Sequence, residues 1–122
     1  MNWTTLLIVV VIVAAFLLVA KGGQISAKAA AGYLKKGALV IDVRSPGEFK
    51  SGHLTNAINI PLDEIESTLS KRVTDKSHVL LLHCASGMRS GAAQKKLNSL
   101  GYTNAFNLGS YGRAKSVLQQ QP

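Results

Sequence analysis

Reactive side chains lie close together in one short segment of the sequence, LLLHCASGMRSGAA, residues 80 to 93. It contains the only cysteine of the 122-residue chain, Cys84, with Arg89 five positions later and Gly87 between them. A cysteine thiolate is a nucleophile, and backbone amides, a helix N-terminus or a guanidinium near the sulfur lower the pKa of the thiol. A cysteine that only fills space in a core needs no polar, glycine-containing loop, so the segment favours a reactive thiol.

A strand before this loop and a helix after it would hold the sulfur of Cys84 at the junction between them. The run VLLL within residues 77 to 84 predicts a strand that is covered on both faces. Ala93, Leu97 and Leu100 recur at helical spacing and predict a helix over residues 90 to 100. Ligands of open parallel sheets bind where a strand leads into a helix, and the loop amides and the helix N-terminus would together bind an anion beside the sulfur.

The rest of the chain after residue 25 alternates between short apolar runs and amphipathic segments. We predict strands over residues 38 to 43, 56 to 61 and 104 to 109, and helices over 26 to 37, 45 to 52, 62 to 73 and 110 to 120. Ser26 is the expected N-cap of the first of these helices. Alternating strands and helices predict an α/β domain with a parallel sheet between helices.

The first twenty residues have a different composition. No charged side chain occurs from Met1 to Ala20, and the 18 residues from Trp3 to Ala20 would reach roughly 27 Å as a helix, close to the thickness of a hydrocarbon core. A cleaved signal peptide is the alternative, but no Lys or Arg precedes the apolar run. We predict a transmembrane anchor over residues 1 to 22 and the α/β domain over residues 23 to 122.

Basic residues follow the apolar run and predict its orientation. The positive-inside rule keeps such a flank in the cytoplasm, so we expect a single-pass protein of the inner membrane with its domain on the cytoplasmic side. The residues concerned are Lys21, Lys28, Lys35 and Lys36.

The charge of the whole chain points to anionic partners. Fourteen Lys and Arg against six Asp and Glu give a formal net charge of +8. Aromatic residues are few and no basic stripe is interleaved with them, so nucleic acid is not an expected partner, whereas a small anionic substrate or an anionic lipid is. A single cysteine allows no intramolecular disulfide, and no set of residues has zinc-ligand spacing, so we expect no metal and no cofactor.

Two stretches resemble the rhodanese, or sulfurtransferase, family. They are VIDVRSPGEFKSGHLTNAINIPL, residues 40 to 62, and LLHCASGMRSGAAQKKLNSLGYTNAFNLG, residues 81 to 109. The resemblance implies a five-stranded parallel sheet flanked by helices, with a persulfide carried on Cys84 as the catalytic residue. It also implies that the loop residues bind the substrate: Ala85, Ser86, Gly87, Met88, Arg89 and Ser90.

Cysteine phosphatases share part of this pattern, and loop length separates the two chemistries. Four residues lie between Cys84 and Arg89, whereas the phosphatase pattern has five. A phosphatase also needs a general acid, and the acidic residues from 63 to 66 look like the solvated face of a helix. We therefore predict transfer of a sulfane sulfur from thiosulfate or a persulfide to a thiol or cyanide, with Arg89 holding the anionic donor or stabilising the charge that develops.

The sequence departs from the family at two places, and a second function stays open. Many members have a cation where this chain has Ala85, which makes thiosulfate a doubtful donor, and the tryptophan common after the last glycines is missing. The alternative function is a non-catalytic rhodanese-like module that binds a membrane protein.

Several polar residues near the loop are expected to be structural. Asp42 and Arg44 should pair with each other or with Glu48 and fix a loop. His53 should be a hydrogen-bonded turn residue. His83 precedes Cys84 on a strand, where neighbours point to opposite faces, so it is not expected to act as the base for the thiol.

Overall fold

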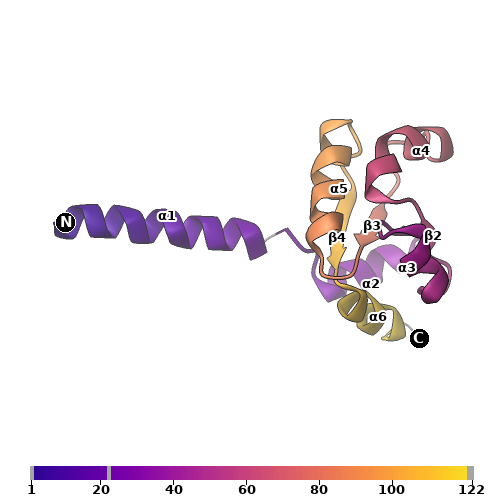
Figure 1. Ribbon diagram of the computed structural model, residues 1–122, viewed down its shortest axis with the longest axis horizontal. Helices are drawn as coiled ribbons and strands as arrows, with labels where there is room; N and C mark the ends of the chain where they lie inside the picture. The colour runs from indigo at the N-terminus through magenta and orange to yellow at the C-terminus, as the bar shows by residue number, and fades with distance from the viewer. Residues whose placement is uncertain (1, 22, 121–122) are drawn as a thin grey trace.

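A long N-terminal helix precedes an α/β domain in the computed structural model of the chain (Figure 1). The structure describes residues 2–21 and 23–120, and the side chains of all of these except residues 17–21. The elements are α1 (Trp3–Lys21), α2 (Ala27–Lys35), β1 (Leu39–Asp42), α3 (Pro46–Ser51), β2 (Ile58–Asn59), the 3₁₀ helix η1 (Leu62–Glu64), α4 (Ile65–Arg72), β3 (Leu80–His83), α5 (Met88–Ser99), β4 (Ala105–Gly109) and α6 (Tyr111–Gln119).

The sheet is parallel, with strand order β2-β1-β3-β4, as the alternation of strands and helices predicted. The expected number of strands was wrong, because the described residues form four strands instead of five. The segment before α2 runs beside β4 but pairs with it through a single bridge, between Gln24 and Asn107. One bridge, with one hydrogen bond of 2.9 Å from the Ile25 amide to the Asn107 carbonyl, does not make a strand.

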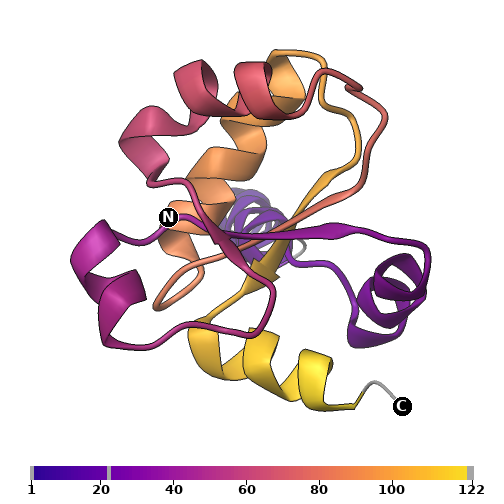
Figure 2. The same ribbon diagram turned by 90° about the vertical axis from the view of Figure 1, so that its right-hand side faces the viewer.

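Helices cover both faces of the sheet (Figure 2). One apolar cluster joins the sheet to α4 and α5, and a second joins it to α2 and α6. The central strand β3 is buried along its length, as its uninterrupted apolar sequence predicted. Burial of a leucine side chain contributes about 1.5–3 kcal/mol, so the three leucines of β3 stabilise the strand directly before Cys84.

Serine side chains define where the helices near this edge begin. Ser26 accepts a hydrogen bond from the Ala29 amide and caps α2, which confirms the predicted cap. Ser45 and Glu48 form a capping box at the start of α3, where Pro46 occupies the first turn. Each of these caps pairs amide groups that the first helical turn leaves without partners.

Helix α1 carries exposed apolar side chains over its described part, from Trp3 to Phe16. Among the residues that the structure describes, no helix is long and apolar enough to cross a membrane. The transmembrane span predicted over Trp3–Ala20 is therefore not supported. The side chains of α1 are described only as far as Phe16, four residues before the end of that predicted span. The domain boundary predicted between residues 22 and 23 falls on Gly22, which lies outside the described residues.

Candidate active site

A tight turn carries the chain from β3 into α5. Gly87 is the N-cap of α5 and has a φ of 97°, in the left-handed region that favours glycine. A Cβ at this position would lie 3.2 Å from Nε2 of Gln24 and 3.4 Å from the carbonyl carbon of Gly109. The left-handed backbone conformation therefore favours a glycine at this position of the loop, and little space is left for a side chain.

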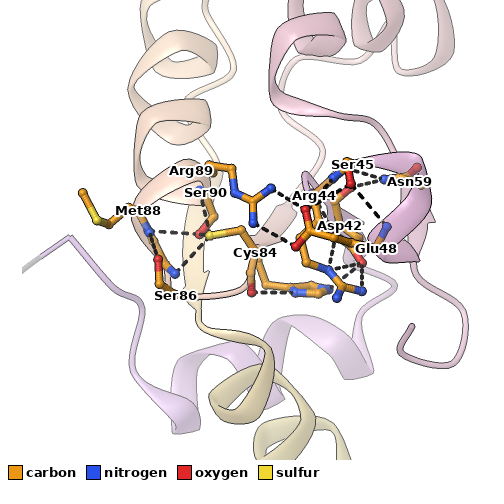
Figure 3. Close-up of polar contacts among 12 residues, drawn as sticks. Asp42, Arg44, Ser45, Glu48, Asn59, Cys84, Ser86, Met88, Arg89 and Ser90 are labelled. Atoms are coloured by element: carbon orange, nitrogen blue, oxygen red, sulfur yellow. Dashed lines mark hydrogen bonds and ion pairs between the residues drawn. The ribbon is translucent and has the colours of Figure 1, made fainter. Parts of the chain in front are cut away.

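The sulfur of Cys84 lies inside this turn, with hydrogen-bond donors directed at it (Figure 3). The Gly87 amide is 3.0 Å from Sγ and the Ser90 amide is 3.4 Å from it. The hydroxyl of Ser90 is 3.5 Å from Sγ. Donors on one side of a sulfur, at the N-terminus of a helix, stabilise negative charge on the sulfur.

These contacts change the acidity of the thiol in opposite directions. Burial raises the pKa of Cys84, but hydrogen bonds from the Ser90 side chain and from the amides of Ser90, Gly87 and Ser86 lower it by more. The net result is a pKa below the ordinary value of a cysteine thiol. The loop therefore favours a thiolate, which is the nucleophilic form.

Ser90 is fixed by a buried network with Asn107. Its Oγ lies 2.7 Å from Oδ1 of Asn107, and Nδ2 of Asn107 donates to the Gly87 carbonyl at 3.1 Å. Oδ1 of Asn107 also accepts from the Gly109 amide at 2.9 Å. The Ser90 hydroxyl therefore lies within hydrogen-bond distance of both Asn107 and the sulfur, beside the two amide donors.

Replacing Ser90 with alanine is expected to raise the pKa of the Cys84 thiol. Loss of one hydrogen bond of this kind corresponds to about a two- to tenfold change in the thiolate equilibrium. The acid limb of the pH–rate profile for thiolate alkylation should therefore move to higher pH. Iodoacetamide labelling of Cys84 across pH measures this shift, with Ser99→Ala, exposed at the far end of α5, as the control. An unchanged profile would contradict the role assigned to the hydroxyl.

Arg89, the charged residue of the loop, is paired with Glu48 of α3 (Figure 3). Its Nη1 lies 2.7 Å from Oε1 and its Nη2 lies 3.0 Å from Oε2, a two-bond pair between side chains that are a little over one-third exposed. The hydrogen bond from Arg89 is the largest cause that lowers the pKa of Glu48 to about 2. From the sequence, Arg89 was predicted to bind the anionic sulfur donor, but Glu48 was not identified as the partner of Arg89.

A second polar cluster lies behind the cysteine, where β1 and β3 end. Asp42 is fully buried and accepts two hydrogen bonds of 3.0 Å from Nε of Arg44 and one of 2.7 Å from its Nη2. Nη2 of Arg44 also donates to the Gly52 carbonyl at 2.7 Å. The guanidinium carbon lies 4.8 Å from the centre of the Tyr111 ring. The predicted pairing of Asp42 with Arg44 is confirmed.

The two histidines near the loop occupy structural positions. His83 is buried, and its Nε2 lies 3.8 Å from Oδ2 of Asp42. Burial lowers the pKa of His83, which favours the neutral ring. His53 stacks on Phe49 and makes a 2.9 Å hydrogen bond with its carbonyl, as expected of a turn residue.

Two of the six predicted loop residues contact the sulfur of Cys84 directly. Gly87 and Ser90 contribute direct contacts to Sγ. Ser86 and Ala85 are exposed at the turn, and the side chain of Met88 is 81% exposed. Glu48 and Asn107 are the functional candidates that sequence reasoning missed, although the Ser45-to-Glu48 spacing of a capping box was a usable signal for the first of them.

The sequence model of the Rhodanese-like domain family matches residues 26–112. A curated relative, the thiosulfate sulfurtransferase PspE of Escherichia coli, is 39% identical over 69 residues, which are 57% of this chain and 66% of the relative. The thiosulfate:glutathione sulfurtransferase of Saccharomyces cerevisiae is 36% identical over 77 residues, 54% of this chain and 55% of the relative. The chain thus spans less than two thirds of the length of these relatives.

Solved structures show the same fold. A rhodanese with anions from E. coli has a TM-score of 0.61 at 35% identity, covering 63% of this chain and 91% of the other. The human single-domain sulfurtransferase TSTD1 has a TM-score of 0.65 at 28% identity, covering 82% of this chain and 98% of the other. With the family match over more than half of its length, the chain belongs to the Rhodanese-like domain family.

Proposed function

We propose that the protein is a rhodanese-type sulfurtransferase that carries a sulfane sulfur as a persulfide on Cys84. The observation that carries this proposal is the position of Sγ inside a turn whose amides of Gly87 and Ser90 point at it. A persulfide formed there would have its terminal, negatively charged sulfur among amide donors. The names of two curated relatives, a thiosulfate sulfurtransferase and a thiosulfate:glutathione sulfurtransferase, support the same chemistry.

The first half-reaction loads the cysteine. The Cys84 thiolate attacks the outer sulfur of thiosulfate or of a small persulfide, and a new sulfur–sulfur bond forms. The bond between the outer sulfur and the rest of the donor breaks, and sulfite or a thiolate leaves with the electron pair. The lowered pKa of Cys84 increases the fraction of thiolate, which is the form that attacks.

The second half-reaction returns the enzyme to its starting state. A thiolate or cyanide attacks the terminal sulfur of the persulfide, and the bond to Sγ breaks. Cys84 leaves as a thiolate, again stabilised by the amides of the loop, and the product is a persulfide or thiocyanate. The two half-reactions together have the order of a ping-pong mechanism.

Intact mass spectrometry of the 122-residue chain tests this proposal. After incubation with thiosulfate or glutathione persulfide, the protein is expected to gain the mass of one sulfur atom, and cyanide should remove it. A chain that gains no sulfur from any of these donors would contradict the enzyme and would favour a binding module.

We also propose that residues 3–20 hold the domain at the cytoplasmic face of a membrane. The support is the uncharged sequence to Ala20 and the exposed apolar side chains of the described part of α1. Fractionation of cells that express the chain tests it, with a chain lacking residues 1–23 as the control. The full chain is expected in the membrane pellet after a carbonate wash, and its recovery in the supernatant would contradict attachment.

A further inference from the structure

The pair between Arg89 and Glu48 sets the charge that a sulfur donor meets beside Cys84. Figure 3 shows the guanidinium of Arg89 between the cysteine and the carboxylate of Glu48. Both terminal nitrogens of Arg89 are directed at Glu48, at 2.7 and 3.0 Å. The positive charge of the loop arginine is therefore balanced by a carboxylate before any donor arrives.

Glu48 is held in this place by its own helix. Its Oε1 accepts hydrogen bonds from the Ser45 amide at 3.2 Å and from the Ser45 hydroxyl at 3.1 Å. The same oxygen accepts the shorter bond from Arg89. Because the capping box fixes the carboxylate on α3, Arg89 cannot turn toward a donor without breaking two charge-assisted hydrogen bonds.

Arg89 also borders an open cavity. This cavity has a volume of about 400 Å³, and its wall includes Ser45, Leu62, Asp63 and Lys96. The charges of Lys96 and Asp63 oppose each other there. Glu48 is thus the group whose removal would leave the arginine charge unbalanced at the loop.

We propose that Glu48 selects among sulfur donors by charge, disfavouring those with a fully ionised sulfonate next to the reacting sulfur. This inference rests on the proposed sulfur transfer. Thiosulfate is a dianion, whereas methanethiosulfonate has the same outer sulfur and is a monoanion. Attack on either donor forms the same Cys84 persulfide, releasing sulfite from the first and methanesulfinate from the second. The extra negative charge of thiosulfate would meet an arginine whose charge Glu48 already balances.

The substitution Glu48→Gln tests this without removing the helix cap, because glutamine also serves in a capping box. It should raise kcat/KM for thiosulfate relative to methanethiosulfonate by about fivefold, the size of one charge interaction near 4 Å in water. The gain should appear mainly as a lower KM and should shrink at high ionic strength. Adding Arg89→Gln to this variant should remove the gain.

The control Glu66→Gln removes the same charge from an exposed position on α4 and should leave the ratio of the two donors unchanged. A ratio that is unchanged or lower in Glu48→Gln would overturn the inference while leaving sulfur transfer intact. A wild-type chain that forms no persulfide with either donor would overturn the proposed function, and this inference with it.

Discussion

Replacing Cys84 with serine is expected to reduce sulfur transfer from thiosulfate by about 1000-fold or more, the usual size of the loss when a covalent nucleophile is removed. A serine hydroxyl is not ionised at neutral pH and cannot form a persulfide. The amides of Gly87 and Ser90 would then surround an oxygen that accepts their hydrogen bonds but attacks no sulfur. Steady-state formation of thiocyanate from thiosulfate and cyanide measures the loss.

This substitution separates chemistry from folding. Cys84 is fully buried, and serine is close to it in size and keeps an acceptor for both amides, so the unfolding midpoint should change little. Ser99→Ala, at an exposed position at the far end of α5, is a control that should keep most of the activity. Sulfur transfer that persists in Cys84→Ser would show that the persulfide is not on this residue.

The elements that position the site could be predicted because their signals are local. The apolar run before Cys84 indicated a buried strand, and β3 (Leu80–His83) is that strand. Helix α5 begins at Met88, two residues before the predicted start, because Gly87 takes the cap position. Apolar periodicity shows that a helix is present but defines its ends poorly, whereas a cap defines the end.

Contacts between distant segments could not be predicted in the same way. Glu48 and Arg89 are 41 positions apart, and nothing in either local sequence pairs them. The segment at Gln24 pairs with Asn107 through one bridge only, so it adds no fifth strand to the sheet. Strand pairs and ion pairs join residues that are far apart in the sequence, so their partners are identified from the folded structure and not from local sequence patterns.

Replacing Asp42 with alanine is expected to lower the free energy of unfolding by about 3 to 5 kcal/mol, the usual cost of leaving one member of a buried ion pair alone. Asp42 is fully buried and Arg44 is 9% exposed, so water cannot replace the lost carboxylate freely. The guanidinium would keep the Gly52 carbonyl and the Tyr111 ring as partners, but neither carries a negative charge. Such a loss is a large part of the 5–15 kcal/mol that stabilises a typical domain.

The double substitution Asp42→Leu with Arg44→Met distinguishes an unpaired charge from a simple loss of contacts. It removes both charges and fills the space with apolar side chains, so it should recover most of the stability lost in Asp42→Ala. Urea unfolding followed by circular dichroism measures all three chains. A cost below about 1 kcal/mol for Asp42→Ala would place the pair among ordinary surface ion pairs. A double variant no more stable than the single one would show that the hydrogen bonds of Asp42, such as that from the Arg44 amide at 2.9 Å, hold the end of β1 in place.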